Sequence, residues 1–181
     1  KKSLVQHLLQ LDLAKIMEQK PLTLVGNFPN NISSQIVFKM LENRQYIPEM
    51  AGMFQKEVAE RLCAEEGTKV YGILSVLSAV YYERRYLFTV DRLEFNPPPK
   101  VQSGVIHFVR KSEGPAHLRY NDLLRVVKSA FNQRRKTLRN ALKALNLPLD
   151  DLAPELLQKR AEQLSPEEFV SLTQTLYPHE H

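Results

Sequence analysis

Short apolar runs alternate with stretches of helical periodicity through the first 111 residues of this chain. An apolar run that ends at glycine or proline favours a buried strand, whereas apolar residues three and four positions apart favour a helix. Strands that alternate with helices are typical of an α/β sheet whose strands are at least partly parallel. We therefore expect strands over residues 22–26, 49–54, 86–90 and 101–109, and helices over residues 32–41, 56–64 and 72–82.

The pattern becomes entirely helical after a Ser-Glu-Gly-Pro segment that is typical of a linker. The final helix has a clear start signal, because Ser165 is a favourable N-cap, Pro166 suits the first helical position and Glu168 completes a capping box. Helices are expected over residues 120–130, 134–145, 154–163 and 165–176. The sequence thus predicts two domains, an α/β domain over residues 1–111 and a small helical domain over residues 112–181.

The composition, with 43% hydrophobic residues and a single cysteine, is that of an ordinary soluble globular protein. Cys63 alone cannot form a disulfide framework, and one cysteine with five scattered histidines does not suit a metal cluster, so we predict no metal. No apolar stretch approaches the roughly 20 residues of a membrane span. We therefore expect a cytoplasmic protein that makes no contact with a membrane.

The net charge of +5 is unevenly distributed along the chain. Between Arg119 and Lys143 there are eight basic residues and one acidic residue, which gives a local charge of +7. From Ala144 onward there are two basic and seven acidic residues, a local charge of −5. A local basic surface is expected of a protein that contacts a phosphate backbone, although a solvated helix face has the same composition.

The loop Gly26-Asn-Phe-Pro-Asn-Asn31 lies between a predicted strand and a predicted helix. Ligands bind at the carboxyl ends of strands in open α/β sheets, which is where this loop falls. The Asn27 side chain and a backbone carbonyl beside the proline can both accept hydrogen bonds from an exocyclic amine, while an aromatic ring stacks on a base. The alternative interpretation is a tight turn in which Asn and Pro serve the backbone alone.

The segment Phe95-Asn-Pro-Pro-Pro-Lys-Val-Gln-Ser103 contains three consecutive prolines, which stiffen the backbone and prevent regular strand pairing. Such a segment would hold Phe95 and Lys100 in place at little entropic cost, as the second wall of a base pocket with a cation for a phosphate. A stiff connector between domains is the alternative interpretation.

The segment from Phe131 to Leu142 contains the densest group of basic residues. If residues 134–145 form one helix, its apolar residues fall on one face and its basic residues on the other. No acidic residue occurs over residues 132–149, whereas solvated helices usually pair acidic with basic side chains. The sequence therefore favours a nucleic-acid backbone as the neighbour of the basic face, which comprises Arg135, Lys136, Arg139 and Lys143.

Five segments in order resemble the ribosomal RNA adenine dimethyltransferase family, and together they are more specific than any one of them. They are residues 27–30, 55–61, 71–75, 95–103 and 131–138. The resemblance implies a Rossmann-like, S-adenosylmethionine-dependent methyltransferase domain followed by a small helical domain. It also implies transfer of methyl groups to N6 of two adjacent adenosines near the 3′ end of small-subunit ribosomal RNA, within the immature small ribosomal subunit.

The same resemblance implies roles for individual residues. Asn27 and the Pro29 carbonyl would accept from the target amine, with Asn27 also next to the cofactor. Phe28 and Phe95 would stack on the flipped base. Because the reaction is then mainly a matter of positioning, no general base is needed. The RNA-binding residues would be Lys100, Arg134, Arg135, Lys136, Arg139 and Lys143.

The chain also departs from the family pattern. Asn30 stands at the fourth position of the catalytic motif, where the family usually has an aromatic residue that stacks on the adenine. A Gly-rich segment that binds the methionine end of the cofactor would precede Lys1. We therefore expect an N-terminally truncated member that lacks the first strands of its sheet, binds the cofactor weakly or not at all, and is inactive alone. A non-catalytic RNA-binding or ribosome-assembly module is the rival hypothesis, and an unpaired sheet edge would favour a dimer.

Overall fold

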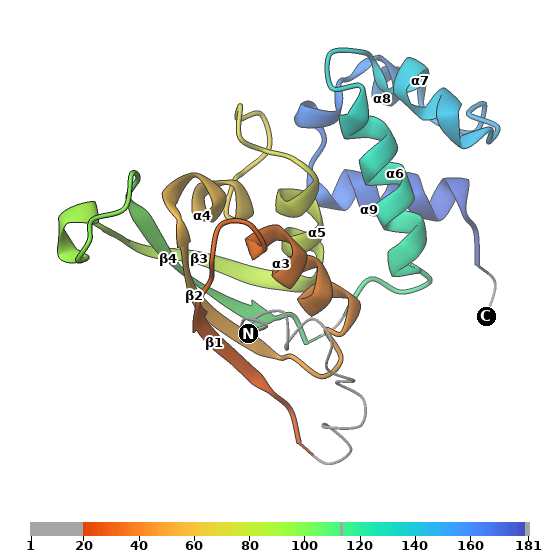
Figure 1. The fold of residues 1–181 in the computed structure, drawn as a ribbon. Helices are drawn as coiled ribbons and strands as arrows, with labels where there is room; N and C mark the ends of the chain where they lie inside the picture. Colours follow the sequence, from red (N-terminus) through yellow and green to blue (C-terminus); the bar gives the residue numbers. More distant parts are fainter. Residues whose placement is uncertain (1–19, 113, 180–181) are drawn as a thin grey trace. The chain divides into compact units, whose positions relative to one another are not determined.

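The computed structural model describes residues 20–112 and 114–179, which form two compact units (Figure 1). Each unit has its own hydrophobic core, and each combines segments that are separated in the sequence. The first unit comprises residues 20–63 and Tyr81–Ser112, and the second unit comprises Ala64–Val80 and residues 114–179.

Residues 64–80 belong to the second unit, although the sequence pattern assigned them to the first domain. Tyr71 provides the physical reason. Its hydroxyl donates to the Leu164 carbonyl over 2.8 Å, and its ring lies edge-on to that of Phe131, with 5.9 Å between the ring centroids. Both partners are distant in sequence, so the local pattern could not reveal them.

A four-stranded sheet forms the centre of the first unit, in the order β1-β2-β4-β3. β1 runs parallel to β2, whereas β4 is antiparallel to both β2 and β3. The prediction of a partly parallel α/β sheet is therefore confirmed. The strands are β1 (Thr23–Asn27), β2 (Glu49–Gln55), β3 (Tyr82–Val90) and β4 (Ser103–Arg110).

Two helices, α3 (Ser33–Glu42) and α4 (Lys56–Leu62), lie on the same side of this sheet (Figure 1). α3 returns the chain from β1 to β2, as a parallel pair requires. α4 begins directly after β2, and its Ala59 lies so close to Gly104 that a methyl group on that glycine would be 2.7 Å from the Ala59 Cβ. The core of this unit includes Val37, Met40, Leu41, Met50, Phe54, Leu62, Ile106 and Phe108.

β3 begins at Tyr82, earlier than the sequence predicts. The Tyr82 side chain is buried, and its hydroxyl donates to the Ile47 carbonyl over 2.7 Å. Burial raises the pKa of Tyr82 to about 12, although the nearby Arg110 and Arg44 lower it. This residue therefore fixes the start of the strand through a side chain that stays neutral.

The second unit is helical. The predicted cap of its last helix is confirmed, because the Ser165 hydroxyl accepts from the Glu168 N–H and the Glu168 carboxylate accepts from the Ser165 N–H, each over 3.1 Å. Desolvation raises the pKa of Glu168, but hydrogen bonds from Ser165 and Lys159 outweigh it and hold the pKa below its ordinary value. The helices are α5 (Ile73–Tyr81), of which only the last residue belongs to the first unit, α6 (Tyr120–Asn132), α7 (Leu138–Ala141), α8 (Pro154–Gln158) and α9 (Pro166–Leu176).

Short 3-10 helices complete the two units. They are η1 (Arg92–Glu94) in the first unit, and η2 (Leu142–Leu145) and η3 (Ala161–Gln163) in the second. Within residues 20–112 and 114–179, every helix is too short or too polar to cross a membrane.

Two predicted helices are shorter than expected, for a common reason. Thr137 and Arg160 have extended backbones and form an isolated antiparallel β-bridge. The helix predicted over residues 134–145 therefore starts only after this bridge, and the helix predicted over residues 154–163 is interrupted by it. Hydrophobic periodicity reports on neighbours along one helix, so it carries no signal of a bridge between distant residues.

Replacing Gly52 with alanine should destabilise the first unit. The added methyl group would overlap the ring of Phe28 and lie 3.0 Å from the ring of Phe54. Overpacking of this kind costs about 1–3 kcal/mol of unfolding free energy, which urea denaturation measures.

The matched control is Gly114→Ala, where nothing lies within 4 Å of the new methyl group. Its unfolding free energy should stay within about 1 kcal/mol of the unsubstituted protein. Equal stability of the two variants would contradict the close packing of Phe28.

Candidate functional site

The chain leaves the sheet at Asn27, the last residue of β1. The Phe28 N–H donates to the Met53 carbonyl over 2.9 Å, which keeps the loop aligned with β2. The loop then turns, and the Ile32 N–H donates to the Pro29 carbonyl over 3.2 Å. Because a carbonyl oxygen has two lone pairs, the Pro29 carbonyl can accept a second hydrogen bond.

A pocket of about 380 Å³ opens at this end of the sheet. The pocket brings the loop after β1 together with the proline-rich segment before β4, which the sequence analysis treated as separate candidates. Every residue predicted to act in catalysis lines it, and so does one predicted RNA-binding residue. These residues are Asn27, Phe28, Pro29, Asn30, Phe95 and Lys100.

Gln55 and Ser103 also line the pocket, although the sequence gave no reason to assign them a function. Gln55 ends β2 and Ser103 begins β4, and the two residues are paired across the sheet. Their neighbourhood depends on strand register, which a single sequence does not specify. The two-residue period of an extended strand is the signal that could have placed Gln55 on the same face as Met53.

Asn27 and Phe28 face opposite sides of the sheet, as consecutive residues of an extended chain do. Phe28 is only 4% exposed, and its ring centroid lies 4.9 Å from that of Phe54. Gly26 and Gly52 leave the space that this ring occupies. Phe28 therefore packs in the core and offers little of its ring to a ligand, whereas Asn27 is exposed.

Phe95 is half-buried and lies directly after η1. The Asp91 carboxylate accepts from the Leu93 N–H over 2.8 Å and so caps this short helix. Lys100 is exposed and directly follows the three prolines, whereas Phe95 precedes them. The segment thus brings an aromatic ring and a cation to one pocket.

Asn30 is exposed at the rim of the pocket. Its carbonyl accepts from the Ser33 hydroxyl over 3.2 Å, so its backbone position is fixed by the start of α3. Its amide side chain has no aromatic surface for stacking. In residues 20–112 and 114–179 there is no group of three or more His, Cys, Asp or Glu side chains arranged to hold a metal.

The basic residues of the second unit do not form one helix face, and that part of the prediction is wrong. Arg135 and Lys136 lie in a turn before α7, Arg139 lies in α7, and Lys143 lies in η2. All four side chains are exposed. The β-bridge at Thr137 separates the turn from the helix, but the four cations still lie within one short stretch of chain.

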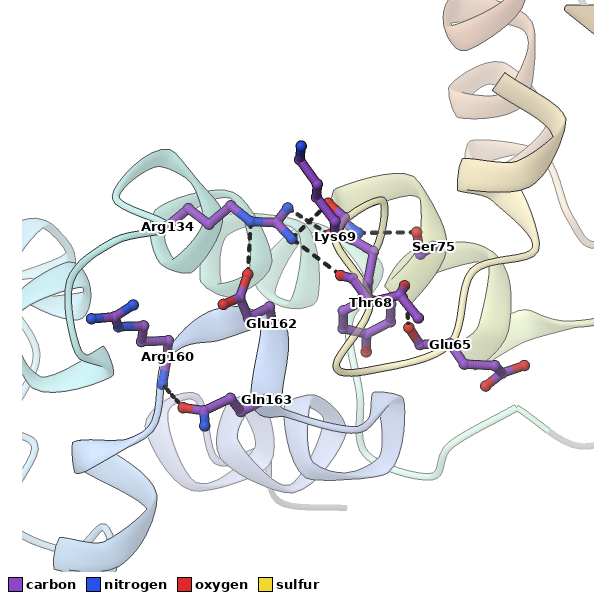
Figure 2. A network of polar contacts seen from close by, with 10 residues as sticks. Glu65, Thr68, Lys69, Ser75, Arg134, Arg160, Glu162 and Gln163 are labelled. Atoms are coloured by element: carbon purple, nitrogen blue, oxygen red, sulfur yellow. Dashed lines mark hydrogen bonds and ion pairs between the residues drawn. The ribbon is translucent and has the colours of Figure 1, made fainter. Parts of the chain in front are cut away.

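Arg134 differs from its basic neighbours because its guanidinium is bound within the second unit (Figure 2). It forms an ion pair with Glu162 at 3.0 Å and donates to the Tyr71 carbonyl over 2.7 Å. It also donates to the carbonyls of Lys69 and Thr68, over 2.9 and 3.3 Å. Arg134 therefore holds the segment that precedes α5.

Residues 2–176 match the family model described as ribosomal RNA adenine dimethylase. The chain belongs to this family. The ribosomal RNA small subunit methyltransferase A of Flavobacterium johnsoniae is 52% identical over 97% of this chain and 67% of its own length. The protein of the same name from Bacteroides thetaiotaomicron is also 52% identical, over 91% of this chain and 62% of its own length. The chain thus spans about two thirds of the length of these two relatives, or slightly less.

Solved structures of related proteins have the same fold. A dimethyladenosine transferase from Plasmodium falciparum superposes with a TM-score of 0.73 and 26% identity, over 83% of this chain and 64% of its own. The 23S rRNA methyltransferase ErmE shares the fold, with a TM-score of 0.63 and 24% identity over 87% of this chain and 66% of its own. The predicted fold class of the dimethylase family, a Rossmann-like sheet followed by helices, is confirmed.

Replacing Arg134 with glutamine should destabilise the second unit. The variant loses the ion pair with Glu162 and the charged donor to three carbonyls. Hydrogen bonds to charged groups are worth about 1.5–3 kcal/mol, and screening of a side chain that is one-third exposed reduces the expected loss to about 1–2 kcal/mol.

Arg135→Gln is the matched control, because it removes the same charge from an exposed side chain. Its unfolding free energy in urea should change by less than about 0.5 kcal/mol. The positioning role of Arg134 is refuted if both variants unfold at the same urea concentration.

Proposed function

We propose that this chain carries the target-base pocket and the RNA-binding surface of an rRNA adenine dimethyltransferase. The reaction transfers methyl groups from S-adenosylmethionine to N6 of two adjacent adenosines near the 3′ end of small-subunit ribosomal RNA, in the immature subunit in the cytoplasm. The observation that carries the proposal is the pocket itself, which joins Asn27 and Pro29 to Phe95 and Lys100.

In this proposal, the pocket acts by orienting an amine. The Asn27 side-chain oxygen and the Pro29 carbonyl accept the two hydrogens of N6, which leaves the nitrogen lone pair directed at the methyl donor. Phe95 stacks on the flipped base, and Lys100 faces the phosphate beside it. Fixing the amine in line with the donor is the main catalytic task, so no general base is required.

In this proposal, the methyl donor lies at the exposed end of β1. Ligands of such sheets bind at the carboxyl ends of the strands, and Asn27 stands at that position with its side chain exposed. S-adenosylmethionine supplies an electrophilic methyl group when it is bound. Asn27 would lie between the donor and the base. Weak cofactor binding by this chain alone, and its inactivity alone, stay predictions.

The RNA surface of the second unit consists of Arg135, Lys136, Arg139 and Lys143, which are exposed cations in a stretch without acidic residues. Arg134 contributes by holding its surroundings, because its guanidinium is occupied. A surface of this kind binds the phosphate backbone through release of counterions.

A non-catalytic RNA-binding or ribosome-assembly module is the second candidate, and Asn30 is the observation that favours it. An asparagine at the pocket rim cannot stack on adenine as the aromatic residue expected there would. Dimerisation stays a further hypothesis: among the described residues, β1 pairs only with β2, and Val25 on it is 72% exposed.

A chimera tests the enzymatic proposal. Because the resemblance predicts a cofactor-binding segment before Lys1, the part of the Flavobacterium johnsoniae relative that this chain does not match is added to the chain in the relative's own order. Dimethyladenosine is then quantified on small subunits that lack the modification. We expect methyl transfer, an increase with Asn30→Tyr, and a loss of about 100-fold or more with Asn27→Ala, because misplacing the amine is costly.

RNA binding by the same chimera separates the two candidates. Reversing the charge of Arg135, Lys136 and Arg139 should flatten the salt dependence of binding by up to about 0.9 log units per lost contact, and Asn27→Ala should leave it unchanged. An inactive chimera that binds RNA through these residues, even with Asn30→Tyr, supports the assembly module instead.

A further inference from the structure

We propose that Gln55 selects the target base by donating its side-chain N–H to a ring nitrogen of adenine beside the amino group, N1 or N7. The inference rests on the proposed function and adds a specificity-determining residue to it. Neither the motifs nor the family resemblance assigned a role to Gln55.

The strand register puts Gln55 on the same face of the sheet as Asn27. Asn27 is the parallel partner of Met53, so the two side chains emerge from one face. Gln55 follows two residues later in the extended strand and therefore shares that face. Ser103 is the antiparallel partner of Gln55 and adds a hydroxyl beside it. Together with Phe95, the three polar residues line one pocket.

These polar side chains are not used by the fold. Within residues 20–112 and 114–179, no side-chain hydrogen bond or ion pair joins Asn27, Gln55 or Ser103 to another residue. The Asn27 side chain is exposed, and those of Gln55 and Ser103 are half-buried. Polar groups that converge on a pocket without partners are typical of a ligand site.

The backbone of Gln55 is also held by its strand partner and by a hydrogen bond of the next residue. It lies at the junction of β2 and α4, where the next residue, Lys56, donates its N–H to the Gln102 carbonyl over 3.0 Å. A side chain on a fixed backbone loses less entropy when it binds a ligand. Gln55 is therefore better placed for recognition than a residue on a loop.

The chemistry of adenine leaves one task for such a donor. Asn27 and Pro29 take the two hydrogens of N6, and both ring nitrogens beside N6 are acceptors that need a donor. The amide of Gln55 provides N–H groups and is a usual partner for the adenine edge. Guanine carries a carbonyl in place of the amine, so it would place an acceptor against the acceptors of Asn27 and Pro29. Its N1 carries an N–H, which would meet the N–H of Gln55.

The test uses the chain as it exists and adenosine monophosphate as the probe, with affinities from ligand-observed NMR titrations. The 1-deaza and 7-deaza analogues each lack one of the two acceptors. The unsubstituted chain should bind one analogue about fivefold more weakly than adenosine monophosphate, because that analogue loses one neutral hydrogen bond. Gln55→Leu should abolish that difference, and so should Gln55→Glu, which keeps the side-chain size but loses the donor.

Gln102→Leu is the matched control. Gln102 lines the neighbouring hollow and accepts from the Lys56 ammonium over 3.4 Å, so its loss should leave the analogue difference intact. The inference is overturned if the unsubstituted chain binds both analogues as well as the parent nucleotide, or if Gln55→Leu preserves the difference. Failure of the unsubstituted chain to bind the nucleotide, or binding that is insensitive to Asn27→Ala, would instead overturn the proposed function on which the inference rests.

Discussion

The ring of Phe28 packs against Phe54, in space that Gly26 and Gly52 leave open. Because neighbouring residues of an extended chain point to opposite faces, a buried Phe28 requires Asn27 to face away from the core. The bond from the Phe28 N–H to β2 continues the parallel pairing one residue beyond β1. One aromatic contact thus fixes both the direction of the Asn27 side chain and the position of the loop that follows it.

In the second unit, too, one side chain holds a segment in place. Arg134 belongs to the same basic run as Arg135 and Lys136, but its guanidinium is bound by Glu162 and by three backbone carbonyls (Figure 2). Its charge is neutralised inside the protein, while its neighbours are exposed. Charge density along the sequence therefore overstates the number of cations that are free to bind a partner.

The local features of this chain could be predicted from its sequence, and the long-range ones could not. The strands β1 and β2, helix α3 and the cap at Ser165 follow from periodicity and from side chains that act on adjacent backbone. The pocket segments were found separately through their residue types. The bridge of Thr137 with Arg160, and the position of Gln55 opposite Ser103, depend on pairing between distant residues, which leaves no trace in local periodicity.

Entry of an RNA adenine into the pocket at the end of β1 is the central claim, and photocrosslinking measures it most directly. An RNA hairpin with a photoreactive azido-adenosine in its loop is irradiated with the chain, and the crosslinked peptides are identified by mass spectrometry. We predict crosslinks in the loop from Asn27 to Asn30 and in the segment from Phe95 to Ser103, which line the pocket together. Crosslinks confined to the basic segment of the second unit would contradict the claim.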